Sequence, residues 1–193
     1  MPTTRALHLD DAAALADLLR ANREFLTPWE PERSDEWFTL AGQRVMVASV
    51  LSQVQSGTVA ARVVLDACGE VAGWIAASGI VRGALRSCTL GYWVDEARNG
   101  QGLATAAVGE MVDLAFGRLG LHRVQAETLV HNVASQRVLE RNGFSRYGVA
   151  PGYLQIAGRW QDHVMFQVLA SDERPGAGAG RSSVRGLEVP EAR

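Results

Sequence analysis

Segment 89–105 constrains the fold of this chain most, because it joins a strand pattern to a helix pattern through two glycines. Leu90–Val94 is apolar and rich in residues that favour strands, and the polar turn Asp95–Asn99 follows it. Gly100 and Gly102 then open a strong helix pattern. Glycines let the backbone come close to a ligand, and the first N–H groups of a helix face negative charge. This order predicts an anion site, of the kind that holds a pyrophosphate.

Two common phosphate-binding motifs do not fit this segment. A P-loop needs Gly-Lys-Ser/Thr before the helix, whereas Leu103 and Ala104 follow the second glycine. A dinucleotide fingerprint needs a small residue where Thr105 stands and an acidic residue about 20 residues later, where the chain has His122. The glycines therefore belong to another kind of phosphate loop.

Segment 99–104 resembles the acetyl-CoA pyrophosphate loop of the GNAT N-acetyltransferases, with the pattern Arg/Gln-x-x-Gly-x-Gly/Ala. The glycine and the final small residue match, while Asn99 stands in place of Arg or Gln. That departure affects one side-chain contact, for which the neighbouring Arg98 is a candidate replacement. Segment 131–144 is similar to the Asn-x-x-Ser-x-x-x-x-x-x-x-Gly-Phe segment that follows the fifth strand in the same superfamily.

Two further stretches, 22–31 and 153–163, narrow the resemblance to the RimJ/RimL group of ribosomal-protein N-terminal acetyltransferases, and within it to the RimJ type. The four matches fall in the expected order between Arg5 and Leu169. The resemblance implies an α/β (α+β) GNAT fold, a mixed central sheet of about six or seven strands flanked by about four helices. It also implies acetyl-CoA as the acyl donor, with no metal.

Composition and hydrophobic pattern divide the chain. Its 193 residues, 47% hydrophobic, suffice for one substantial core. We expect an acetyltransferase domain at 1–170 and a flexible Pro/Gly/Ser-rich tail at 171–193. The net charge of −2 argues against direct nucleic-acid binding. Two cysteines, no signal peptide and no membrane-spanning run predict a cytoplasmic protein. We expect it to be a monomer or a homodimer.

The same patterns predict individual elements. Strands are expected at 6–9, 58–67, 71–80, 90–94, 122–130 and 164–169. Helices are expected at 10–23, at 34–55, at 103–120 and at 132–143. Ser34 is the expected cap of the second helix. Gly120 is expected to stop the third helix, and Gly143, in the left-handed conformation, to close the fourth. Trp160, Asp162 and His163 are expected to form a structural turn.

Acyl transfer to an amine needs a neutral amine, an oxyanion stabiliser and a proton for the leaving thiolate. An α-amino group with a pKa of about 7.7–8.0 is roughly 10–20% neutral at pH 7, but a lysine side chain is neutral only about 0.04% of the time. A weak or water-relayed base therefore suffices for an N-terminal amine.

Glu127 is the candidate base, because it lies five residues before Asn132, where related RimI enzymes have their catalytic glutamate. The alternative is a strand glutamate that pairs with Arg123 or faces water. Ser135 is the candidate acid for the thiolate, since it matches the serine given that role in RimL-type enzymes. The alternative is that Ser135 is an ordinary first-turn serine and Asn132 only an N-cap, although one residue can both cap the helix and contact the cofactor.

The resemblance and the loop also assign binding residues. The expected acetyl-CoA contacts are Trp93, Val94, Asn99, Gly100, Gln101, Gly102, Leu103, Ala104, Thr105 and Asn132. The expected acceptor-binding residues are Asn22, Trp29, Glu30 and Tyr92. The alternatives are that the aromatic residues belong to the core and that acidic residues near Ser34 only complement a helix dipole.

Three functions remain open. One is acetylation of the N-terminal α-amine of a protein, such as a ribosomal protein. Another is acetylation of a small amine, such as an antibiotic, an amino acid or a polyamine. The last is an acyl-CoA-binding module without turnover, against which Glu127 and Ser135 argue.

Overall fold

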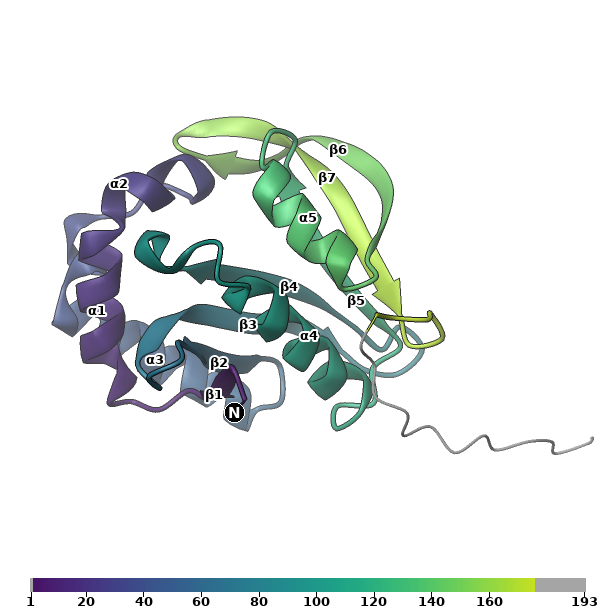
Figure 1. Cartoon of the computed structure of the whole chain (residues 1–193), viewed down its shortest axis with the longest axis horizontal. Helices are drawn as coiled ribbons and strands as arrows, with labels where there is room; N and C mark the ends of the chain where they lie inside the picture. The colour runs from purple at the N-terminus through teal and green to yellow at the C-terminus, as the bar shows by residue number, and fades with distance from the viewer. Residues whose placement is uncertain (1, 176–193) are drawn as a thin grey trace, which may run out of the picture.

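A seven-stranded mixed sheet organises the chain in the computed structural model, which describes residues 2–175 (Figure 1). The strands are β1 (Thr4–Ala6), β2 (Ala60–Leu65), β3 (Val71–Val81), β4 (Ser87–Val94), β5 (Arg123–Leu129), β6 (Ser145–Ile156) and β7 (Arg159–Leu169), in the spatial order β1-β2-β3-β4-β5-β7-β6. The helices are α1 (Asp11–Ala21), α2 (Arg23–Leu26), α3 (Leu40–Gln55), α4 (Leu103–Phe116) and α5 (Val133–Arg141). Short 3₁₀ turns lie at η1 (Thr27–Trp29), η2 (Asp35–Phe38) and η3 (Glu96–Arg98).

Helices cover both faces of the sheet, and each face has its own apolar core. Met111 of α4 and Leu139 of α5 pack with Val124 and other strand residues on one face. On the opposite face, Leu15 of α1 and Val47 of α3 pack against β2 and β3. The alternation of side chains along the inner strands sends successive residues to these two cores.

The parallel pair β4–β5 is the irregular part of the sheet. Its pairing covers only Ser87–Thr89 against Arg123–Gln125. Beyond that point β4 stays paired with β3 as far as Val94, and β5 stays paired with β7 as far as Leu129. The two strands therefore separate towards their carboxyl ends, beside the start of α4.

The predicted fold class is confirmed, but some element limits were wrong. The first strand is Thr4–Ala6, because these residues pair with β2, whereas Leu9 lies exposed before α1. The expected helix 34–55 is divided: η2 comes first, and α3 begins after Thr39, whose hydroxyl accepts a hydrogen bond from the Gly42 N–H.

Three corrections concern the second half. Helix α4 ends at Phe116, before the expected stop at Gly120. The expected Trp160–His163 turn lies on β7, and the actual turn is Ala157–Gly158, where both φ angles are positive. Strand β6 was not predicted, because it is an edge strand with mostly exposed side chains and no clear alternation.

The residues after β7 make their own contacts with the domain. The Asp172 carboxylate accepts a hydrogen bond from the Leu169 N–H at 2.9 Å. Arg174 pairs with Asp113 of α4 at 2.7 Å and lies over the Phe116 ring. Residues 176–193, most of the expected tail, lie outside the described part of the chain. Within residues 2–175, no helix has the length and hydropathy needed to cross a membrane.

Candidate active site

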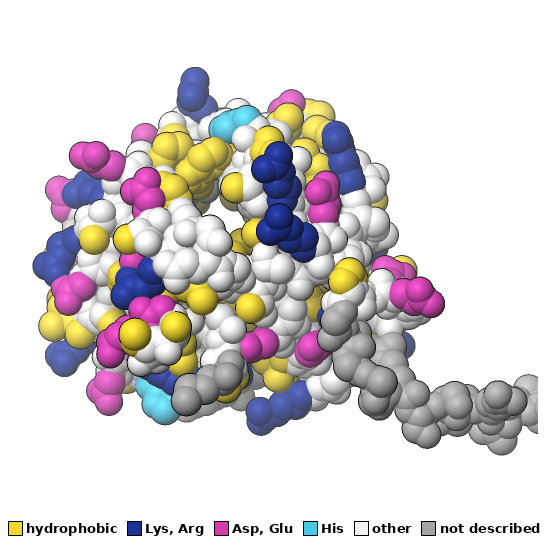
Figure 2. Space-filling view, viewed as in Figure 1, with side chains coloured by type: hydrophobic (Ala, Val, Ile, Leu, Met, Phe, Trp, Pro, Cys, Tyr) yellow, Lys and Arg dark blue, Asp and Glu magenta, His cyan; other side chains and the backbone are white. Residues whose placement is uncertain are grey.

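A cavity of about 460 Å³ lies where β4 ends, between the N-terminal turns of α4 and α5. Figure 2 shows the hollow among hydrophobic side chains, with basic side chains over α5 beside it. Nine of the ten expected acetyl-CoA contacts line this cavity: Trp93, Val94, Asn99, Gly100, Gly102, Leu103, Ala104, Thr105 and Asn132. The tenth, Gln101, is exposed and does not line it. We call this space the cofactor cavity.

The glycine loop has the geometry that an anion requires. Gly100 and Gly102 have φ angles of 78° and 79°, a left-handed conformation that residues with a side chain rarely adopt. Gly102 is the N-cap of α4, and the first helical hydrogen bond runs from the Ala106 N–H to its carbonyl. The preceding N–H groups, from Leu103 to Thr105, therefore have no partner among the described residues. They and the helix dipole favour a phosphate at this point.

The start of α5 brings two hydroxyl groups together at the cofactor cavity. The Asn132 side chain accepts a hydrogen bond from the Ser135 N–H at 3.1 Å, so it is an N-cap that also lines the cavity. The Ser135 hydroxyl lies 2.8 Å from the Tyr92 hydroxyl of β4. Burial raises the pKa of Tyr92 to about 12, against the opposing effect of its hydrogen bond to Ser135. Tyr92 therefore remains a hydrogen-bond donor at neutral pH.

Trp29 forms part of the wall of the cofactor cavity. Its ring centroid lies 5.4 Å from that of His131, which precedes α5. The side chain thus links η1 to the start of α5. It is half-exposed rather than part of either apolar core.

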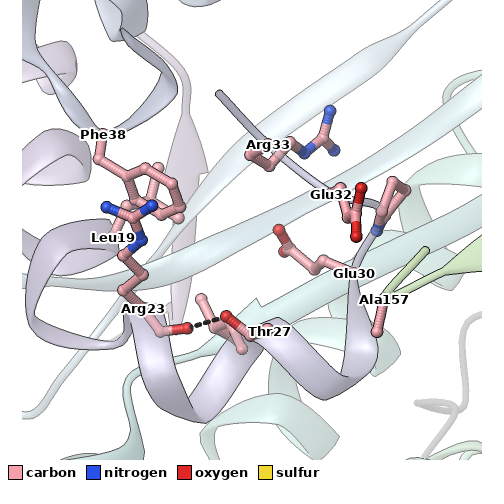
Figure 3. A pocket seen from close by; sticks show the side chains of 10 residues that line it. Leu19, Arg23, Thr27, Glu30, Glu32, Arg33, Phe38 and Ala157 are labelled. Carbon is pink, nitrogen blue, oxygen red and sulfur yellow. Dashed lines mark hydrogen bonds between the residues drawn. The ribbon is translucent and has the colours of Figure 1, made fainter. Parts of the chain in front are cut away.

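Two further cavities lie beside α1, and one of them reaches β4. An outer cavity of about 360 Å³ is lined by α1, α2 and the segment 30–33 (Figure 3). An inner cavity of about 380 Å³ lies between α1, α3 and the β3–β4 pair. Glu30 lines both, and the inner cavity shares Tyr92 and Trp93 with the cofactor cavity. A donor on one side of β4 and an acceptor on the other would meet at these two residues.

The Glu30 carboxyl points into the outer cavity, between Thr27 and Arg33 (Figure 3). It has no hydrogen-bond partner among residues 2–175. Burial raises its pKa, and the positive charge of Arg33 opposes this effect. The Glu30 carboxyl is therefore partly desolvated, and it forms no ion pair with any cation among the described residues.

Glu127, the residue expected to be the base, has different surroundings. Burial raises its pKa, and its charge is the main cause of a raised pKa at Tyr153. It lines none of the three cavities. The alternative pairing with Arg123 does not occur, because that guanidinium lies over the Tyr147 ring instead. The role of Glu127 as a base stays a prediction.

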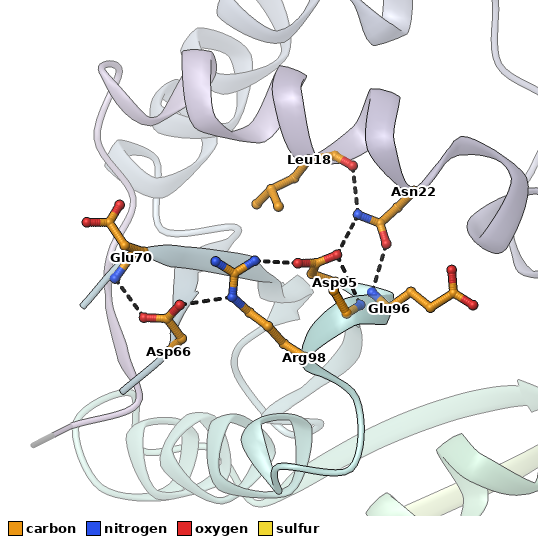
Figure 4. Close-up of polar contacts among 8 residues, drawn as sticks. Leu18, Asn22, Asp66, Glu70, Asp95, Glu96 and Arg98 are labelled. Carbon is orange, nitrogen blue, oxygen red and sulfur yellow. Dashed lines mark hydrogen bonds and ion pairs between the residues drawn. The ribbon is translucent and has the colours of Figure 1, made fainter. Parts of the chain in front are cut away.

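Asn22 was expected to bind the acceptor, but the structure places it in a buried polar network (Figure 4). Its amide donates to the Leu18 carbonyl and to Asp95, both at 2.9 Å, and accepts from the Glu96 N–H at 2.8 Å. Because Asn22 is buried and both of its N–H groups are used, it instead fixes the end of α1 against the turn after β4.

Arg98, the candidate replacement for the loop contact, belongs to the same network. Its guanidinium binds Asp66 at 2.9 Å and also binds Asp95 (Figure 4). Although Arg98 lines the cofactor cavity, its charge is already paired. The spacing Asp95-x-x-Arg98 was the available sequence signal for this pairing.

Comparison with known proteins places this geometry in a family. The profile of the acetyltransferase (GNAT) domain matches residues 3–145. The [ribosomal protein uS5]-alanine N-acetyltransferase of Escherichia coli is 32% identical over 173 residues, which cover 89% of this chain and 89% of that protein.

Two solved structures show the same fold. The ribosomal-protein-S5-alanine acetyltransferase of Vibrio fischeri has a TM-score of 0.83 at 31% identity, over 89% of this chain and 94% of that one. RimJ of Mycobacterium smegmatis, in complex with CoA-disulfide, has a TM-score of 0.83 at 31% identity, over 86% and 81%. The chain therefore belongs to the GNAT family of N-acetyltransferases and is similar to its RimJ-type members.

Proposed function

We propose that this protein transfers the acetyl group of acetyl-CoA to the N-terminal α-amine of a protein, of the ribosomal-protein-alanine type. The observation that carries the proposal is the meeting of the cofactor and inner cavities at Tyr92 and Trp93. Relatives named for the same reaction, at 31–32% identity over most of the chain, support the acceptor class. The domain at 1–170 is proposed as the catalytic unit.

The residues of the cofactor cavity divide the binding of acetyl-CoA between them. The N–H groups at the start of α4 hold the pyrophosphate, and the open turn at Gly100 and Gly102 lets it come close. Asn132 and the separated edge of β4 flank the arm that leads to the thioester. In this arrangement the thioester reaches the Tyr92–Ser135 pair.

Ser135 and Tyr92 stabilise the leaving thiolate by hydrogen bonding. A free thiol has a pKa of about 8.5, so a full proton transfer from a phenol of pKa about 12 is uphill by roughly 5 kcal/mol. The pair therefore acts mainly through charge-assisted hydrogen bonds to the sulfur, which are strong in a partly buried site. The proton that the thiolate finally takes comes from the amine or from water.

Two carboxylates compete for the role of base. The resemblance to related enzymes supports Glu127. The cavities support Glu30, because its side chain lines both spaces on the acceptor side, one of which reaches Tyr92 and Trp93. We infer that Glu30 receives the α-ammonium group and helps to remove its proton.

The function is tested with a panel of acceptors and a measurement of CoA release, with mass spectrometry of the products. Short peptides with a free N-terminal alanine are compared with the same peptides N-formylated, with free lysine, and with polyamines and aminoglycosides. We expect turnover of the unblocked peptides and little of the rest. A small amine that outpaces every peptide would replace the acceptor class and keep the chemistry. No turnover with any amine, despite binding of acetyl-CoA, would favour the non-catalytic module.

A further inference from the structure

Gly91 is an exposed glycine inside β4, at a position where the strand is paired with β3. Glycine weakens a strand, because it has no side chain to pack and loses much backbone entropy on folding. Its φ angle is not positive, so the backbone conformation does not require glycine here. A Cβ atom at this position would meet no other described residue within 4 Å, so packing does not require it either. The missing side chain therefore leaves free space beside the strand.

The alternation along β4 shows on which face of the sheet this free space lies. Gly91 and Trp93 are two residues apart and share a face, and Trp93 packs with the α1–α3 core. Tyr92 points to the opposite face and packs with the α4–α5 core. In agreement, Gly91 lines the inner cavity but not the cofactor cavity. The free space at Gly91 therefore belongs to the acceptor side, next to the two residues where the cavities meet.

The neighbours of Gly91 on this face make the floor of the inner cavity uneven. Gly91 is paired with Ala76 of β3, so the two residues together contribute a single methyl group. The next pair along the strands is Trp74–Trp93, and both of these indole rings line the cavity. In the other direction Ser78, the next β3 residue on this face, is exposed. The floor is therefore low at the Ala76–Gly91 pair, between two large rings and a solvent-exposed stretch of β3.

We propose that Gly91 is a specificity-determining residue for the acceptor, because its missing side chain lets the peptide chain beyond the first acceptor residue pass over β4. The α-amine then lies at Tyr92 and Trp93, while the following residues lie over the low part of the floor. A glycine inside a strand often marks a place where a ligand or another backbone approaches closely. A peptide carries a carbonyl and a side chain at every residue, so it needs more room here than a short amine. This inference rests on the proposed function and names the feature of that site that admits a peptide.

The test compares Gly91→Ala and Gly91→Val with the wild type on two acceptors. One is a tetrapeptide with N-terminal alanine, and the other is alaninamide, which has the same first residue and ends after its first amide. Gly148→Val is the matched control. Gly148 is also a strand glycine without a positive φ and with open space around it, but it lies on β6, three strands from β4, and lines none of the cavities described above.

Two further measurements show whether the added side chain occupies free space. Gly91→Ala should unfold at the same temperature as the wild type or a higher one, because alanine loses less backbone entropy than glycine on folding. Its affinity for acetyl-CoA in calorimetry should not change, because Gly91 does not line the cofactor cavity. A lower melting temperature or weaker acetyl-CoA binding would overturn the inference, since the space at Gly91 would then not be free.

We expect Gly91→Val to lose about tenfold or more in kcat/KM on the tetrapeptide and to stay within about threefold of the wild type on alaninamide. Gly91→Ala should give a smaller loss on the tetrapeptide, and Gly148→Val should match the wild type on both acceptors. Equal losses of Gly91→Val on the two acceptors would overturn the inference. If the wild type acetylates the tetrapeptide and Gly91→Val does so equally well, the proposed function survives and the inference fails. Turnover of small amines without any peptide by the wild type would remove both.

Discussion

Replacing Glu30 by glutamine tests which carboxylate serves the acceptor amine, with Glu127→Gln as the matched control. Both side chains are half-buried glutamates whose pKa is raised by burial, but only Glu30 lines the acceptor-side cavities. Without a base the enzyme depends on the amine that is already neutral, roughly 10–20% at pH 7, which costs about five- to tenfold. Loss of assistance during attack brings the expected fall in kcat/KM to the order of 10²-fold at pH 7.

The assay is the pH profile of kcat/KM for an alanine peptide between pH 6 and pH 9.5. The deficit of Glu30→Gln should shrink to about tenfold near pH 9, where most of the amine is neutral. Glu127→Gln should stay within about threefold of the wild type at every pH. The reverse result would give the base role to Glu127. Small, pH-independent losses in both variants would leave a water relay and refute the cavity argument.

Unfolding measurements provide a second, independent readout for Glu30. Because burial raises its pKa in the folded protein, protonation stabilises the fold below the ordinary pKa of about 4.3, and this contribution disappears as pH rises through the raised value. Glu30→Gln should therefore unfold at a higher temperature than the wild type at pH 7–8 and show little gain at pH 4. A gain at neutral pH together with lost activity would mark a residue kept for function.

Three further predictions concern the cofactor cavity and its support. Gly102→Asp should weaken acetyl-CoA binding in calorimetry by roughly 10²-fold, because it adds negative charge beside the pyrophosphate. Gly57→Asp is the control: Gly57 has a comparable φ of 74° and open space around it, so the substitution causes similar backbone strain but should keep the affinity. Ser135→Ala and Tyr92→Phe should each lower kcat about tenfold, and the double variant little further, because the two hydroxyls act as a pair; additive losses would contradict this. Asn22→Leu should lower the free energy of unfolding by about 3 kcal/mol and the melting temperature by about 6–12 °C, without a specific effect on acceptor choice.

Features with a local physical cause were predictable from the sequence. The turn at Gly100 and Gly102 was predictable because its positive φ angles need glycine, and the cap at Asn132 because its side chain bonds within the same turn. Features set by distant packing were not. Asn22 lies in a segment that resembles an acceptor-binding stretch, and its partners Asp95 and Glu96 are more than 70 residues away.

The residues around the inner cavity also depend on distant packing, which the sequence does not reveal. Gln43 looks like an ordinary polar residue near a helix start, and only the packing of α1 and α3 against the sheet buries it. The boundary between η2 and α3, missed in the expected helix 34–55, is what places Trp37 beside it. A helical pattern read without that break assigns both residues to one continuous helix, so it does not predict that the Gln43 amide binds the Trp37 carbonyl.

In the proposed site, the end of β4 allows donor and acceptor to be held in separate cavities and still meet. Successive residues of a strand point to opposite faces, so Tyr92 packs with the α4–α5 core and Trp93 with the α1–α3 core. Beyond Thr89, β4 is no longer paired with β5, so the backbone groups of β4 that face β5 form no hydrogen bonds within the sheet there. Had the pairing with β5 continued to Val94, the sheet would separate the cofactor cavity from the inner cavity, which meet at Tyr92 and Trp93. The proposed reaction site therefore depends on the separation of β4 from β5, while β4 stays paired with β3 along its other side.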